Sequence, residues 1–265
     1  MERLKKILHD KYYQSYFNEK DTSNITKELV DINNIRDYVS NVIVNNKIKK
    51  HAGVYNLKSK TIFINPEIII DKSIKWMNTF PLDVSDIGMI KLCNLFILET
   101  INHELRHAIQ NKKADNIDNN PANIIIKEGI DFCKHKDNLL ALGDKLFYKF
   151  LYKNVIIERE ASIMALVDII NLDKEINFIS QFEKNQYINQ KLLKTIKSGY
   201  SLRSCPAEKY FRLKLKYGKY KNIINNITYD YETSLSLGLP INDETYNELK
   251  NNDENKIINK ILTKK

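Results

Sequence analysis

The run from Ile87 to Gln110, IGMIKLCNLFILETINHELRHAIQ, constrains the fold more than any other part of the sequence. It contains His103, Glu104 and His107 in the pattern H-E-x-x-H. On an α-helix, residues four apart lie on one face, so the two imidazoles can bind one metal ion. Glu104 then projects to the side, where its carboxylate can reach a metal-bound water without being a ligand. The run therefore predicts a helix that carries two metal ligands with an acid beside them.

The residues around this motif are mostly apolar, as in a helix that is buried in a domain core. They are Ile90, Cys93, Phe96, Ile97, Ile101, Leu105, Ala108 and Ile109. Polar side chains inside such a coat are costly to bury unless they bind something. A lone histidine would more often be an ordinary core residue, but the pair with its glutamate favours a zinc site if a third ligand exists.

A second stretch, Val155 to Ile170, VIIEREASIMALVDII, supplies a candidate for the third ligand. Helical spacing places Glu158 on one face with small and apolar residues, Ala161, Ser162, Ala165 and Ile169, and places Glu160 elsewhere. Small residues let this helix approach the histidine helix closely enough for metal bonds of about 2 Å. Glu158 is therefore the predicted third ligand. The alternative is a surface helix on which Glu158 and Glu160 are ordinary solvated charges.

The segment His103-Glu104-Leu105-Arg106-His107, followed by Glu158-Arg159-Glu160-Ala161, resembles the zincin metallopeptidases, in the gluzincin-like branch whose third ligand is a downstream glutamate. That branch includes small intracellular metallopeptidases that cleave phage repressors. The resemblance implies a zincin-like core, a Zn²⁺ cofactor held by His103, His107 and Glu158, and a protein or peptide substrate. Glu104 would be the catalytic general base, taking a proton from the attacking water and passing it to the leaving amine.

Two features depart from the family pattern. Ser162 stands where many relatives have Asp or Asn, so the partner of a zinc-bound histidine has to come from another residue. The interval from His107 to Glu158 is also longer than in the compact members, which implies an inserted helix. The donor that would stabilise the oxyanion is not identified. Candidates are the tyrosines and basic residues of the segment that holds Tyr200, Arg203, Tyr210, Tyr217, Tyr220, Tyr229 and Tyr231, although core and surface packing is their commoner role.

Other readings of the motif can be compared with the sequence. A di-iron bundle needs a second E-x-x-H pair, and the sequence has none. A deformylase-like site needs an upstream cysteine, but Cys93 would lie about 15 Å from His103 on the same helix. The remaining alternative is a non-catalytic helical binding or structural protein, nucleic-acid associated, with a degenerate motif. The scattered lysines and the absence of a recognised nucleic-acid-binding motif weigh against it.

Composition sets the class of the protein. With 265 residues, 43% hydrophobic and 10% aromatic, the chain can bury a substantial core, and seven glycines and five prolines favour helices. The net charge of +9 accompanies an excess of Lys, Asn and Ile that is typical of AT-rich coding. We expect a predominantly helical α+β protein with a catalytic core over 1–170 and a helical region over 171–265 packed on it. One single domain over 1–265 stays open, as does the oligomeric state.

The sequence also gives expectations about the cellular compartment. Cys93, Cys133 and Cys205 are far apart and read as reduced thiols. The N-terminus has no apolar signal region, and the most apolar run, Leu92 to Ile101, is too short to span a bilayer. We therefore expect a soluble, cytoplasmic protein without a membrane partner.

The remaining elements are expected from local patterns. Residues 1–47 are predicted to be helical, including a second apolar set, Ile35, Tyr38, Val39, Val42 and Ile43. Thr61–Ile64 is the clearest strand, in a hairpin that either binds an extended peptide by strand addition or simply covers the metal helix. Ile68–Met77 is a short helix or strand. Asp83, Ser85 and Asp86 are N-cap candidates for the central helix, whose end is predicted near Gln110.

Overall fold

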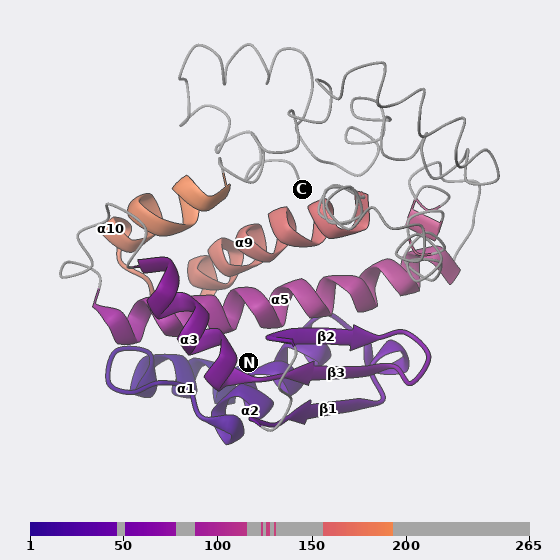
Figure 1. Cartoon of the computed structure of the whole chain (residues 1–265), viewed down its shortest axis with the longest axis horizontal. Helices are drawn as coiled ribbons and strands as arrows, with labels where there is room; N and C mark the ends of the chain where they lie inside the picture. The colour runs from indigo at the N-terminus through magenta and orange to yellow at the C-terminus, as the bar shows by residue number, and fades with distance from the viewer. Residues whose placement is uncertain are drawn as a thin grey trace, which may run out of the picture. The chain divides into compact units, whose positions relative to one another are not determined.

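The computed structural model describes residues 1–46, 51–77, 88–115 and 156–192, together with residues 123, 126, 127 and 130. These residues form an α+β structure in which helices predominate and one small sheet is present, as the composition predicts (Figure 1). Several predicted features lie outside the described residues. They are the N-cap candidates at 83–86, residues 131–155 of the interval in which an inserted helix is expected, Cys133, Cys205 and all the tyrosines from Tyr200 onward.

Two helices open the chain, α1 (Glu2–Lys11) and α2 (Glu19–Ile32). Helix α2 begins with a capping box in which Asn18 accepts the backbone N–H of Asp21, and the Asp21 side chain accepts the backbone N–H of Asn18. Their apolar faces are buried, with Leu4 and Leu8 on α1 and Ile25 on α2 fully inaccessible. The helical prediction for this part of the chain is therefore confirmed.

The helical prediction for Ile35 to Ile43 is wrong. A single 3₁₀ turn, η1 (Arg36–Tyr38), is followed by strand β1 (Asn41–Val44). Burial along β1 alternates residue by residue, which is the period of a strand and not of a helix. Its residues Val42, Ile43 and Val44 are β-branched, and parallel pairing with a distant strand decides the conformation of such a short apolar run.

The sheet has three strands in the order β1-β3-β2. Strand β3 (Thr61–Ile64) lies in the centre, parallel to β1 and antiparallel to β2 (Gly53–Asn56). The predicted strand and hairpin are thus confirmed. Asn56 shapes the hairpin turn, because its side-chain oxygen accepts the backbone N–H groups of Lys58 and Ser59 at 3.0 and 3.1 Å.

Helix α3 (Pro66–Met77) follows the sheet directly and settles the open choice between helix and strand for Ile68–Met77. Pro66 occupies the first helical position, where the missing N–H costs nothing. The side chain of Asn65 accepts the backbone N–H of Ile68 at 3.0 Å and so caps the helix.

The longest described helix is α5 (Met89–Asp115), which contains the H-E-x-x-H motif. It continues five residues beyond Gln110, so its predicted end is too early. Its apolar coat is buried, with Cys93, Ile97 and Ile101 fully inaccessible. Asn94 is also fully buried and ties α5 to the turn between α1 and α2: it donates to the carbonyls of Tyr12 and Ser15 and accepts the N–H of Phe17.

The predicted acidic helix is present as α9 (Ile156–Ile176), followed by the single turn α10 (Gln181–Glu183) and the π-helix η2 (Lys184–Asn189). The buried carboxylate of Asp173 closes the end of α9, because it accepts the backbone N–H groups of Phe178 and Ile179 at 2.8 and 2.7 Å. It also forms an ion pair with Lys184. Within the described residues, no helix is long and apolar enough to cross a membrane.

The chain divides into two compact units, Met1–Lys112 with Met164–Asn189, and Lys113–Ile163 with Gln190–Lys265. The first contains the sheet, helices α1 to α3, and most of α5 and α9. Within it, α5 runs between the sheet on one side and α9 on the other, as Figure 1 shows. Of the second unit, the described part is mainly the start of α9. Residue 170 of the predicted boundary lies inside α9.

Candidate metal centre

The two histidines lie one turn apart on α5 and are both half-buried. Their Nε2 atoms are 3.2 Å apart, and the rings are nearly perpendicular, at 88°, with centroids 4.8 Å apart. A tetrahedral ion with bonds of about 2 Å holds its ligand atoms about 3.3 Å from one another. The spacing of the two nitrogens therefore fits a pair of ligands to a single zinc ion.

Glu158 lies in the first turn of α9. One ligand atom each from His103, His107 and Glu158 lie within 4.8 Å of one another, and no other group of three metal-binding side chains is found in the described part of the chain. The donor set, two imidazoles and one carboxylate, is one that zinc accepts.

The burial of α9 does not fit the alternative of a solvated surface helix. Ala161 and Ala165 are fully buried, Glu160 is only 1% exposed, and Glu158 is half-buried. Arg106 of the motif forms an ion pair with Asp168 of α9, at 3.7 Å. Helix α9 is therefore a core element that packs against α5, as a helix supplying a ligand has to do.

Glu104 is buried, with 7% of its surface exposed, and its side chain lies against the first residue of β2. A Cβ atom placed on Gly53 would be 2.8 Å from the Glu104 Oε1 atom and 2.7 Å from the Thr100 Cγ2 atom. Only a residue without a side chain therefore allows this strand to approach α5 so closely. Sequence reasoning missed this contact, since nothing near Gly53 in the chain points to α5.

A second contact that sequence reasoning missed involves Gln110. Its Oε1 atom is 2.9 Å from the Nδ1 atom of His107, and the residue is 1% exposed. The spacing of three residues on a helix was a signal available in the sequence, because residues three apart are neighbours on the helix surface. The contact was missed because the helix was predicted to end near Gln110, whereas α5 continues to Asp115.

Tyr187 of η2 is a further buried polar group that packs on α5. Its hydroxyl donates to Glu99 at 2.7 Å, one turn before His103, and its ring packs against Phe96. Burial, and then the neighbouring Glu99 carboxylate, raise the pKa of Tyr187 well above its usual value. Tyr187 therefore stays a neutral hydrogen-bond donor across the physiological range.

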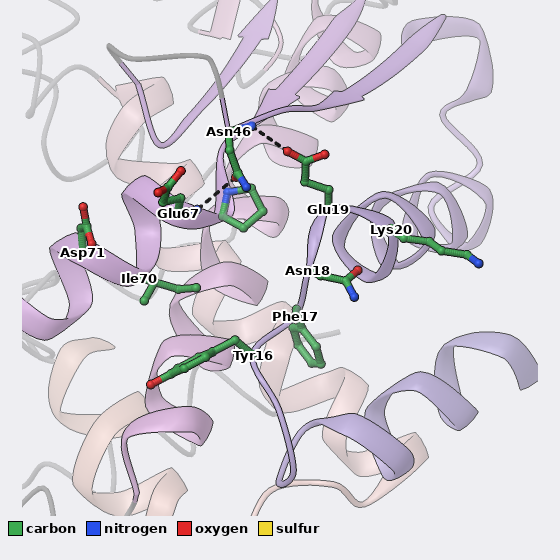
Figure 2. Close-up of a pocket in the computed structure, with 10 residues that line it drawn as sticks. Tyr16, Phe17, Asn18, Glu19, Lys20, Asn46, Glu67, Ile70 and Asp71 are labelled. Atoms are coloured by element: carbon green, nitrogen blue, oxygen red, sulfur yellow. Dashed lines mark hydrogen bonds between the residues drawn. The ribbon is translucent and has the colours of Figure 1, made fainter.

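A pocket of about 690 Å³ lies away from these residues, and none of the predicted site residues lines it. Figure 2 shows Glu19, at the start of α2, across from Glu67 of α3, and Tyr16, from the turn before α2, near Ile70 of α3. Among its polar groups, Glu19 accepts the backbone N–H of Asn46 at 2.9 Å. The predicted site residues therefore lie on α5 and α9 and not in this pocket.

No family model, curated protein or solved structure matches the chain.

Proposed function

We propose that the chain is a zinc-dependent metallopeptidase, with His103, His107 and Glu158 as ligands and Glu104 as general base. The observation that carries the proposal is the convergence of ligand atoms from these three residues within 4.8 Å, with the two histidine nitrogens already at ligand spacing. The resemblance to zincins with a glutamate third ligand supports the same assignment, and a zincin-like core is part of the proposal.

The roles of the residues follow from their positions. Zinc held by this trio would lower the pKa of a bound water towards neutrality and polarise a peptide carbonyl. Glu104 is next to His103 in sequence, and its side chain lies against Gly53 of β2, which restricts its position. It would accept the proton of the attacking water and deliver it to the departing amine.

The sheet supports a peptide as the substrate class. In the described part of the chain, β2 pairs with β3 alone and leaves its other edge open. This edge strand begins at Gly53, which contacts Glu104. An extended peptide added to the edge would gain backbone hydrogen bonds and pass close to the general base.

Two variants test the proposal. Glu104→Gln should bind one zinc per chain like the wild type and hydrolyse no peptide, because the amide cannot accept the proton. Asp115→Asn is a matched control, since it removes an exposed carboxylate from the end of the same helix. Zinc content is measured on purified protein and turnover with a mixed peptide library. Normal turnover in Glu104→Gln would end the proposal.

The third ligand has its own test. Glu158→Gln should lower the zinc affinity, whereas Glu175→Gln, at an exposed position on the same helix, should leave it unchanged. A non-catalytic helical module with a degenerate motif would instead bind less than one zinc per wild-type chain. That result would also contradict the ligand assignment.

A further inference from the structure

We infer that Gln110 is the positioning residue of the metal centre, fixing the tautomer and the orientation of the His107 ring. This inference rests on the proposed function and adds a residue to which the H-E-x-x-H pattern gives no role.

The contact itself shows how the fixing works. The Oε1 atom of Gln110 lies 2.9 Å from Nδ1 of His107, and a carbonyl oxygen only accepts hydrogen bonds. The contact therefore selects the form of His107 that carries its proton on Nδ1. In that form Nε2 carries the lone pair of the ring, and Nε2 is the atom that faces His103 at 3.2 Å. A histidine that binds a metal needs this arrangement, with one nitrogen donating to a fixed acceptor and the other open to the ion.

The helix explains why Gln110 can hold the ring firmly. Gln110 is three residues after His107, and α5 continues unbroken to Asp115, so the two side chains are neighbours on one helical face. The side chain of Gln110 is 1% exposed, which restricts its rotamers and keeps water from competing for Nδ1. Since His107 is only half-buried, the ring depends on this contact for its orientation more than a fully packed ring would.

Two substitutions at Gln110 separate positioning from packing. Gln110→Met keeps the approximate shape and removes the acceptor. Gln110→Glu keeps the acceptor and removes the donor. If Gln110 positions His107, the zinc affinity falls about 10- to 100-fold in the Met variant and stays within a few-fold of wild type, or tightens, in the Glu variant. If Gln110 only fills the core, the Met variant should bind zinc more tightly than the Glu variant. The reason is that Met is well tolerated in an apolar interior, whereas a buried carboxylate is not.

The experiment measures the zinc dissociation constant of each full-length variant by competition with a chromophoric chelator. The visible spectrum of the cobalt-substituted protein reports the ligand geometry, and urea unfolding of the metal-free protein reports the core. A Met variant that binds zinc as tightly as wild type, or a Glu variant that binds more weakly than Met, overturns the inference. Failure of the wild type itself to bind one zinc would overturn the proposed function as well, so the two failures are distinguishable.

Discussion

The close approach of Gly53 to Glu104 can be tested by adding a single methyl group to Gly53. Gly53→Ala introduces a Cβ where the structure leaves 2.7 Å to Thr100 Cγ2 and 2.8 Å to Glu104 Oε1. Carbon atoms in optimal contact are about 3.5 to 4.0 Å apart, so at least one neighbour has to move by about 0.8 Å. The backbone of Gly53 is outside the left-handed region, so the added side chain acts through this crowding and not through strain in φ.

Two effects of different size follow from the crowding. Overpacking should lower the free energy of unfolding by about 1–3 kcal/mol. The reduced entropy of the unfolded chain should raise it by about 0.4–1 kcal/mol, so the net decrease should be about 1–2 kcal/mol. Displacement of the Glu104 carboxylate by nearly 1 Å should lower kcat by about 10- to 100-fold, since general-base catalysis depends on position at that scale. Zinc affinity should not change, because the nearest atoms to the added Cβ belong to Thr100 and Glu104 and not to a ligand.

A second substitution separates the two effects. Thr100→Ser removes the Cγ2 methyl group and keeps the hydroxyl that donates to the Phe96 carbonyl at 2.8 Å. The double variant Gly53→Ala/Thr100→Ser should therefore recover much of the lost stability and little of the lost kcat, because the contact with Glu104 remains. Urea unfolding and peptide turnover measure the two quantities in the same preparations.

Gly88→Ala serves as the control for a glycine substitution near the start of α5. Gly88 has φ = +79° and no atom within 4 Å of an added Cβ, so alanine there should cost about 1 kcal/mol of stability through backbone strain and leave kcat unchanged. A folded Gly53→Ala variant with wild-type kcat would refute the proposal that Glu104 is a general base held against β2.

Three further predictions concern stability. Asn94→Ala should lower the free energy of unfolding by about 3 kcal/mol, because it leaves three backbone groups in the turn between α1 and α2 without their partner; urea denaturation measures this. Asp173→Asn should cost about 2 kcal/mol, since it removes the charge that Lys184 neutralises, and adding Lys184→Met should restore part of the loss in a double-mutant cycle. Burial raises the pKa of the Cys93 thiol from 9.0 to about 11, although a hydrogen bond with the Ser73 side chain acts in the opposite direction. The thiolate therefore forms more easily in the unfolded chain than in the folded protein. The contribution of Cys93 to stability should be constant below pH 9 and decline as the pH rises towards 11; Cys93→Ala should show a smaller alkaline loss than wild type.

Local patterns were enough to predict the elements that carry the candidate ligands. The continuous apolar coat identified α5, and the mixture of small and apolar residues identified α9, because both helices are long and buried on most sides. The strand Thr61–Ile64 was equally clear from its β-branched and aromatic residues and the turn before it. The roles of His103, His107 and Glu158 as zinc ligands stay predictions, although their ligand atoms do lie close together.

Apart from the contact between His107 and Gln110, the parts that were missed depend on partners far away in the chain. Strand β1 has an apolar pattern compatible with either period, and its parallel pairing with β3 decides in favour of a strand. The contact of Gly53 with Glu104 joins residues in a strand and a helix that no local rule connects. The link between Tyr187 and Glu99 spans an even longer interval. Contacts of this kind come from tertiary packing, which a single sequence does not display.

The polar residues within α5 show why the candidate site lies where it does. Asn94 and Glu99 have structural partners, the turn after α1 and the hydroxyl of Tyr187. His103 and His107 also face each other, and the two atoms that lie 3.2 Å apart are both ring nitrogens. Two such nitrogens attract each other only through a shared proton or a shared cation, since their lone pairs alone repel. A half-buried helical face that sets two imidazoles in this relation, beside a carboxylate, is better suited to holding a metal ion than to packing a core.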